Sequence, residues 1–278
     1  MRFASDFLQK LERLTLVVRR PSGRVGERTS KAAGLSTEFR DFRPYHTGDS
    51  LRYVDWRAYA RLGRLFTKLF TAERNTHIHL LLDASASMAV GDKLLYAARL
   101  AAALAYLSTQ AGPVHPRLLG GAAWAPVALK AALPQLWEQL SALAPQGKLA
   151  VSQSLISFAQ EIRSALVILL SDCLDPQGLE AGLRALAVAG AEVLIVQVLS
   201  PWDLEPPPGA FELEDAETGQ KLSIDEEAVA AYRRRLRRYC EALRQACHAR
   251  GFHYLQISTQ RPVEQVVLID LRQEGLVA

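Results

Sequence analysis

Short apolar runs alternate with helical segments from residue 77 onward, and this alternation constrains the fold more than any other feature. The run at residues 165–170 is almost continuously apolar, as in strands of a parallel sheet that helices cover on both faces. Strands that alternate with helices predict a mainly parallel, doubly wound α/β sheet. We expect strands at residues 77–83, 114–119, 165–172, 192–199 and 252–257, and helices at 93–110, 131–143, 153–163, 177–189 and 225–249.

A proline-rich segment at residues 201–224 interrupts this alternation. Within it, residues 211–214 and 221–224 have the pattern of two short strands, and a Thr-Gly pair at 218–219 suits the turn between them. Asp225, followed by two glutamates, is a suitable N-cap for the next helix. We therefore expect a β-hairpin inserted at the rim of the α/β domain.

The first part of the chain is basic, whereas the rest is weakly acidic. Of the 33 Lys and Arg and the 29 Asp and Glu, residues 1–74 hold 16 and 8, a net charge of +8 that leaves −4 for the remainder. Apolar residues at helical spacing in residues 3–18 predict an amphipathic helix that packs on the domain. We expect a basic N-terminal region over residues 1–76 and the α/β domain over 77–278. No RNA-binding motif or helix-turn-helix pattern accompanies the charge, so nucleic acid is not the expected partner.

Three features of the sequence predict a cytoplasmic protein. The longest apolar helical stretch, residues 94–107, contains Arg99 and is shorter than the ~20 residues that span a bilayer. Charged residues interrupt the apolar ones near the N-terminus, so we expect no secretory signal there. The three cysteines lack metal-binding spacing, as expected in a reducing compartment.

A polar loop follows the first expected core strand. In open parallel sheets, ligands bind at the carboxyl ends of the strands where the strand order reverses. In this loop Asp83, Ser85 and Ser87 offer one carboxylate and two hydroxyl groups that can converge on a small ion. Such hard oxygen donors favour Mg²⁺ or Mn²⁺, and a shell with so few anionic ligands leaves the ion open to a carboxylate from outside.

Asp172 ends another expected core strand and should lie at the same edge of the sheet. We assign it a water-mediated role beside the ion. The alternative is that Asp83 and Asp172 only cap turns, which is common for aspartates that follow strands. Taken alone, the Asp-x-Ser-x-Ser pattern does not exclude that alternative.

Known catalytic patterns are missing from the sequence. An aspartyl-nucleophile phosphatase needs a second carboxylate two residues after the first, and Ser85 stands there instead. The sequence contains no Gly-x-Ser-x-Gly elbow, no Gly-x-Gly-x-x-Gly fingerprint and no P-loop. We therefore expect a protein that is not an enzyme, with any ATP hydrolysis performed by a partner.

Three blocks, at residues 34–45, 48–61 and 83–88, resemble in order and spacing the bacterial family called domain of unknown function 58; they read GLSTEFRDFRPY, GDSLRYVDWRAYAR and DASASM. The resemblance is strong over residues 24–90 and more general beyond them. It implies a von Willebrand factor A-like (Rossmann-like) domain with a metal-ion-dependent adhesion site, and association with MoxR-type AAA+ ATPases. It implies no established biochemical activity.

The same resemblance assigns Asp83, Ser85 and Ser87 to the first motif of the metal site and Asp172 to its last acidic position. The middle motif departs from the pattern, because residues 147–154 lack the usual threonine. Ser152, or less readily Ser154, could replace it through its hydroxyl group. If neither does, the ion is bound weakly or not at all.

Two other groups of residues have simpler interpretations. Alternating Arg and Asp residues, Arg43, Asp49, Arg52 and Asp55, together with Trp56, predict a network of ion pairs that fastens the N-terminal region to the domain; the alternative is direct contact with a partner. His77 and His79 share one face of a strand, but no third ligand is near in sequence, so we expect packing or surface positions.

These observations predict a non-catalytic, metal-dependent adaptor. Its Mg²⁺ or Mn²⁺ would capture an acidic residue of a protein partner, such as a client or a MoxR-type AAA+ ATPase. One alternative is a scaffold that binds partners without metal. Another is a nucleic-acid-binding protein that uses the basic N-terminal region, with an affinity that falls steeply as salt rises.

Overall fold

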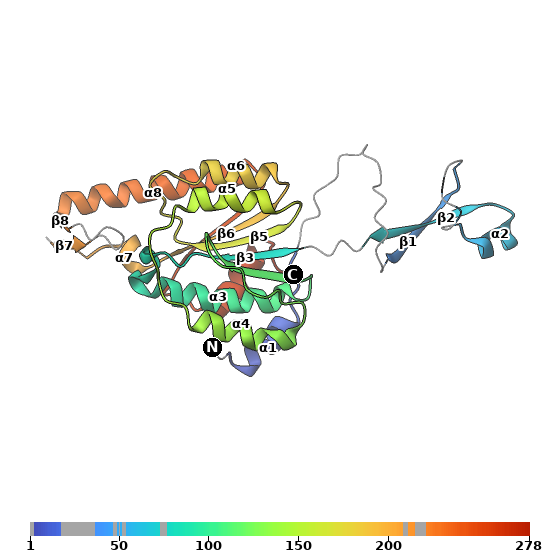
Figure 1. The fold of residues 1–278 in the computed structure, drawn as a ribbon, viewed down its shortest axis with the longest axis horizontal. Coiled ribbons are helices and arrows are strands. Elements are labelled where there is room, and N and C mark those ends of the chain that lie inside the picture. The colour runs from blue at the N-terminus through green and yellow to red at the C-terminus, as the bar shows by residue number, and fades with distance from the viewer. Residues whose placement is uncertain are drawn as a thin grey trace. The chain divides into compact units, whose positions relative to one another are not determined.

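The computed structural model describes residues 3–17, 37–46, 49, 51, 54–72, 77–207, 211–214 and 221–278. The chain divides into two compact units. The larger unit contains Met1–Pro21 and Thr76–Ala278 and holds the central sheet, whereas the smaller unit contains Ser22–Asn75 (Figure 1).

Five parallel strands form the central sheet of the larger unit, in the order β4-β3-β5-β6-β9. They are β3 (Ile78–Leu82), β4 (Val114–Leu118), β5 (Leu166–Ser171), β6 (Glu192–Leu199) and β9 (His253–Ser258). Each strand therefore begins and ends within one residue of its expected position. Isolated antiparallel bridges join Val114 to Val127 and Arg117 to Ala123, and they cover part of the outer edge of β4.

Helices cover both faces of this sheet (Figure 1). Side chains alternate along a strand, so Leu80 and Leu82 of β3 pack on one side and Leu81 on the other. The helices are α3 (Lys93–Ser108) and α4 (Leu133–Ser141) on the side of Leu80, and α5 (Val151–Glu161), α6 (Glu180–Val188) and α8 (Glu226–His248) on the side of Leu81. The prediction of a doubly wound, parallel α/β fold is confirmed.

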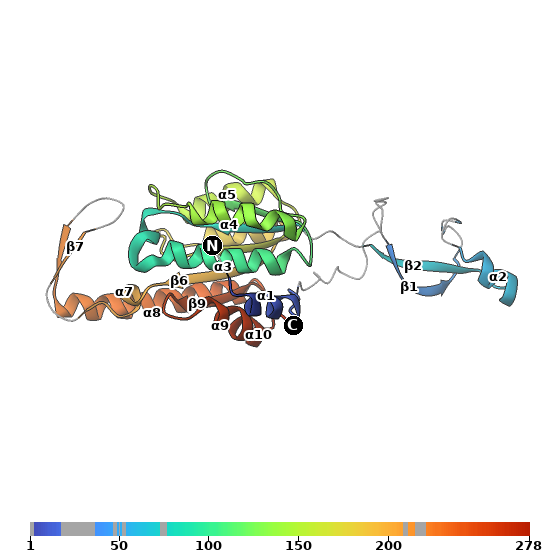
Figure 2. The ribbon, with the colours of Figure 1, turned by 90° about the horizontal axis from the view of Figure 1, so that it is seen from below.

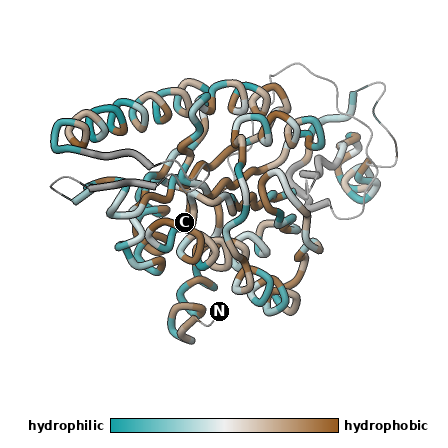
Figure 3. Tube along the Cα trace, turned by 60° about the vertical axis from the view of Figure 1, so that its left-hand side comes forward, coloured by the Kyte–Doolittle hydropathy of each residue, from teal (hydrophilic) through white to brown (hydrophobic). Residues whose placement is uncertain are grey.

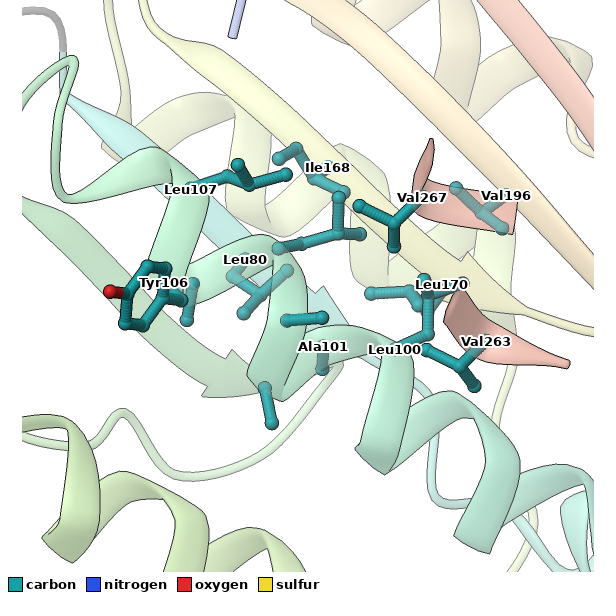
Figure 4. Packing of buried hydrophobic residues seen from close by; sticks show 14 of the residues in the cluster. Leu80, Leu100, Ala101, Tyr106, Leu107, Ile168, Leu170, Val196, Val263 and Val267 are labelled. Atoms are coloured by element: carbon teal, nitrogen blue, oxygen red, sulfur yellow. The ribbon is translucent and has the colours of Figure 1, made fainter. Parts of the chain in front are cut away.

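α3 lies almost wholly inside the protein, with 14 of its 16 residues buried. A helix that is apolar all round needs cover on every side, and α3 has the sheet on one side and α4 and α1 on others. Six alanines allow these close approaches. Figure 4 shows Leu100 and Ala101 of α3 beside Leu80 and Leu170 of the sheet.

The first helix, α1 (Ser5–Glu12), belongs to the larger unit. Phe7 and Leu11 are buried in the cluster that contains α3. Thr15 and Ala278 exchange two backbone hydrogen bonds of 2.9 Å, next to an antiparallel bridge between Leu16 and Val277. The predicted packing of this helix on the α/β domain is therefore present, and residues 1–21 group with the larger unit.

Three short helical segments near the C-terminus complete this side of the sheet. They are α9 (Val263–Gln265), the π-helical segment η4 (Val266–Asp270) and α10 (Leu271–Gln273). They lie near α1 (Figure 2), and Val263, Val266 and Leu271 are buried in the same cluster. The sequence did not predict them, because each is too short to show a helical period.

The smaller unit is built on an antiparallel pair, β1 (Thr37–Pro44) and β2 (Phe66–Ala72), with α2 (Trp56–Leu62) between them in sequence. The Arg43 guanidinium pairs with Asp49 at 2.6 Å, and Asp55 caps α2 by accepting hydrogen bonds from two backbone N–H groups. Both interactions lie within the unit. The predicted ion pairing is thus present for Arg43 and Asp49, whereas Arg52 lies outside the described residues.

The hairpin expected between residues 201 and 224 is also present. β7 (Phe211–Glu214) and β8 (Lys221–Ile224) pair antiparallel, after a short helix α7 (Pro201–Leu204). The turn expected at 218–219 lies outside the described residues. Asp225 caps α8, as expected, by accepting a 2.7 Å hydrogen bond from the backbone N–H of Ala228.

Hydrophobic residues concentrate in the sheet and on the inner sides of its helices, whereas the outer helix surfaces are largely hydrophilic (Figure 3). Among the described residues, no helix combines the length and hydropathy needed to cross a bilayer.

Candidate functional site

The strand order reverses between β3 and β5. From β3 the chain crosses to β4 at one edge, and from β5 it continues through β6 to β9 at the other. Asp83 follows β3 and Asp172 follows β5, and the backbone N–H of Asp83 donates a 2.9 Å hydrogen bond to the Leu170 carbonyl. Both aspartates therefore occupy the place where doubly wound sheets bind ligands.

The Asp83 carboxylate is fully buried and held by two hydrogen bonds. Its Oδ1 accepts from the backbone N–H of Ser85 at 2.8 Å, and its Oδ2 accepts from the Ser171 hydroxyl at 2.6 Å. Burial raises the pKa of Asp83 and the negative charge of Asp172 adds to this effect, while the two hydrogen bonds oppose it. The orientation of the carboxylate is thus fixed by the strand ends.

The hydroxyl oxygens of Ser85 and Ser87 are 3.1 Å apart. Ser85 is buried and Ser87, in the 3₁₀ segment η2 (Ala86–Asp92), is half-buried. Two hydrogen bonds connect this loop to its neighbour, from the Ala86 N–H to the Gly147 carbonyl at 3.0 Å and from the Gln146 N–H to the Ala84 carbonyl at 2.7 Å. The loop that carries the two serine hydroxyl groups is therefore held in place by backbone hydrogen bonds to residues 146 and 147.

Ser152 is occupied elsewhere. It lies in the first turn of α5, where its hydroxyl accepts a 3.1 Å hydrogen bond from the Gly182 N–H of α6. Its own N–H donates to Asp175 at 3.0 Å. Ser154 faces Gly120, since a Cβ added to that glycine would lie 2.9 Å from the Ser154 hydroxyl oxygen. Within the described part of the chain, no hydrogen bond joins either serine to Asp83, Ser85 or Ser87, and the assignment of Ser152 as a ligand stays a prediction.

Asp172 has a partner that the sequence did not predict. The ammonium group of Lys93, at the start of α3, lies 2.8 Å from Asp172 Oδ2. Lys93 is only 1% exposed. The other carboxylate oxygen of Asp172 accepts a 3.1 Å hydrogen bond from the Leu174 N–H. Lys93 therefore neutralises the negative charge of Asp172, the residue to which we assigned a water-mediated role beside the ion.

Asp203 of α7 is the second partner of Lys93, at 3.2 Å. It also forms a capping box with Ser200, in which Asp203 Oδ2 accepts 2.7 Å hydrogen bonds from both the N–H and the hydroxyl of Ser200. Lys93 thus connects the start of α3 with the ends of β5 and β6. Two sequence signals were available. Lys93 is a single lysine at the start of a strongly apolar helix, and Ser200-x-x-Asp203 has the capping-box spacing.

A family described as "Protein of unknown function DUF58" matches residues 41–246. The chain belongs to the DUF58 family. An uncharacterized protein of Mycobacterium tuberculosis strain H37Rv is 32% identical to this DUF58 chain over 216 residues, which cover 72% of this chain and 68% of the relative. An uncharacterized protein of Mycobacterium bovis has the same identity and coverage.

Two solved structures resemble the DUF58 chain distantly. The conserved hypothetical protein BatB from Bacteroides thetaiotaomicron has 14% identity and a TM-score of 0.46, over 72% of this chain and 98% of that protein. The pilus adhesin SpaC from Lactobacillus rhamnosus GG has 10% identity and a TM-score of 0.45, over 74% of this chain and 31% of the adhesin.

The donors in this DUF58 loop fit part of a divalent-ion site. Octahedral Mg²⁺ binds oxygen at about 2.1 Å, which places neighbouring ligand atoms roughly 3 Å apart. The 3.1 Å between the hydroxyl oxygens of Ser85 and Ser87 matches that spacing. Asp83 adds the carboxylate, but no cluster of three or more His, Cys, Asp or Glu suited to a metal is found among the described residues. For an ion to bind here, water or an external group would have to supply the remaining ligands.

Proposed function

We propose that this DUF58 protein is a non-catalytic binding module whose Asp83–Ser87 loop holds Mg²⁺ or Mn²⁺ and captures an acidic residue of a partner protein. The observation that carries the proposal is the buried, oriented Asp83 carboxylate beside two hydroxyl oxygens spaced at 3.1 Å, at the switch point of the doubly wound sheet.

The charges around the loop support the selection of an anionic partner. Lys93 neutralises Asp172, so Asp83 is the anionic group that remains for the ion. A divalent cation with one carboxylate ligand keeps a net positive charge and open coordination positions. A glutamate or aspartate of a partner supplies both the charge and the oxygen ligand that the site lacks.

We propose a binding role rather than a catalytic one. Ser85 stands where a phosphatase of this sheet type needs its second carboxylate. The proposed partner is an acidic surface of a MoxR-type AAA+ ATPase or of its client, following the family resemblance, and the ATPase would supply any energy-dependent step.

Titration of the whole protein with Mn²⁺ and Mg²⁺ tests this proposal. Calorimetry is carried out with metal alone and with excess N-acetylglutamate as a substitute for the partner carboxylate. We expect saturable binding that is tighter with the carboxylate and is lost in Ser85→Ala and Ser87→Ala. Ser157→Ala, which removes an exposed hydroxyl from α5, is the matched control and should bind as the wild type does.

The second candidate function is a metal-independent scaffold, and the Lys93–Asp172 pair favours it, because the protein already has a cation at this edge. It predicts no metal binding with or without N-acetylglutamate. Equal binding by all the serine variants would also contradict the proposed site.

A further inference from the structure

A second recess lies between α7 and α8, outside the Asp83–Ser87 loop. It is a groove of about 720 Å³. Its apolar floor is formed by Leu204, Leu236 and Cys240, which belong to one small apolar cluster. Burial raises the pKa of Cys240, so its thiol is neutral at physiological pH and adds to the apolar floor.

One rim of the groove is basic. Arg233, Arg237 and Arg244 line it. At about 100° per residue, these three positions fall within about 40° of one another on the helix surface. Three more arginines, Arg234, Arg235 and Arg238, lie at other angles around α8 and do not line the groove.

The arginines of the rim have N–H groups that are not used in hydrogen bonds within the described part of the chain. Arg233 donates from Nη2 to the Pro206 carbonyl at 2.9 Å, while its buried Nε has no hydrogen-bond partner. Arg237 is exposed and makes no ion pair with any described residue. Arg244 has a long, exposed contact of 3.7 Å with Glu241, and its guanidinium carbon lies 5.7 Å from the centre of the Tyr254 ring. The guanidinium groups of Arg237 and Arg244 can therefore each donate two hydrogen bonds to a carboxylate of a partner.

The combination of an apolar floor and a basic rim limits the occupant. A bulky apolar side chain fits the floor, and carboxylates on either side of it complement the arginines. A phosphate polymer would make no use of the apolar floor of Leu204 and Leu236. Glu205 and Glu241 also line the groove and disfavour any anion close to them, so the carboxylates of the occupant must lie at the arginines.

We propose that this groove binds an acidic segment of a partner protein, in which a bulky apolar side chain lies between carboxylates. The interaction is separate from the metal loop and needs no divalent ion. It gives the protein a second contact surface, so a partner that engages both sites gains avidity.

Fluorescence anisotropy of a labelled peptide tests the groove. The peptide has a central Leu-Phe pair with three glutamates on each side, and the buffer contains EDTA and about 150 mM salt, which limits charge effects to about 8 Å. We expect Arg237→Glu and Arg244→Glu to weaken binding at least about tenfold. Arg234→Glu and Arg238→Glu make the same charge change on other faces of α8 and should alter affinity less than about threefold.

A peptide with Ser-Ser in place of Leu-Phe should bind at least about tenfold more weakly if the floor is used. Equal losses in groove and control variants would overturn the proposal, as would equal binding of the Ser-Ser peptide. A labelled DNA oligonucleotide that binds more tightly than the peptide and is lost in the same groove variants would assign the surface to nucleic acid instead. Because EDTA removes divalent ions, the peptide assay does not depend on metal binding by the Asp83–Ser87 loop. The proposal for the groove can therefore hold even if the loop binds no metal.

Discussion

The ammonium group of Lys93 lies 2.8 Å from Asp172 Oδ2, and neither side chain is more than 3% exposed. This ion pair joins the first turn of the most central helix to the end of the central strand β5. Removing one partner of such a pair leaves an uncompensated charge in a poorly solvated place.

Lys93→Met should lower the free energy of unfolding by roughly 3 to 5 kcal/mol in denaturant titrations, because Asp172 and Asp203 lose their counter-ion. Lys93→Met combined with Asp172→Asn should recover part of this loss, since only Asp203 then remains unpaired. The matched control is Lys130→Met, which breaks an exposed contact with Glu12 and should change stability little. Equal effects of Lys93→Met and Lys130→Met would contradict the importance of the buried pair.

Gly91→Ala should be strongly destabilising. Gly91 has φ +61°, and a Cβ there would lie 2.3 Å from the Cβ of Ser200, inside the capping box with Asp203. Backbone strain of about 1 to 2 kcal/mol adds to a steric penalty of roughly 1 to 3 kcal/mol. Gly178→Ala measures the backbone strain alone, because Gly178 has φ +72° and no atom lies within 4 Å of the added Cβ. Urea unfolding of both variants measures the difference, and similar losses would show that the Ser200 contact is easily relaxed.

His79 should make the stability of the protein depend on pH. Burial, together with the nearby His115 and His77, lowers the pKa of His79 to about 4. Above about pH 6.5 the imidazole is neutral in both the folded and the unfolded state. Between about pH 6.5 and 4 the unfolded chain binds the proton first, so stability falls as the pH falls.

Thermal unfolding of wild type and His79→Gln across that pH range checks this expectation. The variant should lose less stability on acidification, with Arg117 and Glu161 unchanged nearby. Parallel curves for the two proteins would show that other groups control the pH dependence of stability. His115 is one such group, because burial lowers its pKa as well.

Leu11→Ala tests the attachment of α1 to the α/β unit. Leu11 is completely buried, and its truncation should cost about 2 to 5 kcal/mol of unfolding free energy. Leu95→Ala on α3 is the control, because Leu95 is 56% exposed and should change stability by about 0.5 kcal/mol or less. A small effect at Leu11 would mean that α1 contributes little to the core.

The sequence predicted the sheet well because each strand carries its own signal. A run such as Leu166–Ser171 is buried on both faces, and its continuous apolar composition together with its short length favours a strand. The proximity of Asp83 and Asp172 was predictable for a related reason, since parallel strands end at one edge. These inferences need only local pattern and topology.

Lys93 and Ser152 show where such inference stops. The partner of a buried lysine depends on which strand end lies above the first turn of its helix, and no local pattern carries that information. Ser152 was assigned by its place in a family motif, but its hydroxyl direction is set by the packing of α5 against Gly182. The packing of α1, in contrast, was predictable, because the apolar residues at helical spacing in residues 3–18 indicate a face that must be covered.

The pairing of Leu16 with Val277 also has a consequence for biosynthesis. The segment that contains α1 leaves the ribosome early, but the backbone groups that complete its edge are synthesised some 260 residues later. Until then, this side of the nascent domain stays open, and its apolar surface is available to chaperones. This side of the domain can therefore close only after both Leu16 and Val277 have left the ribosome.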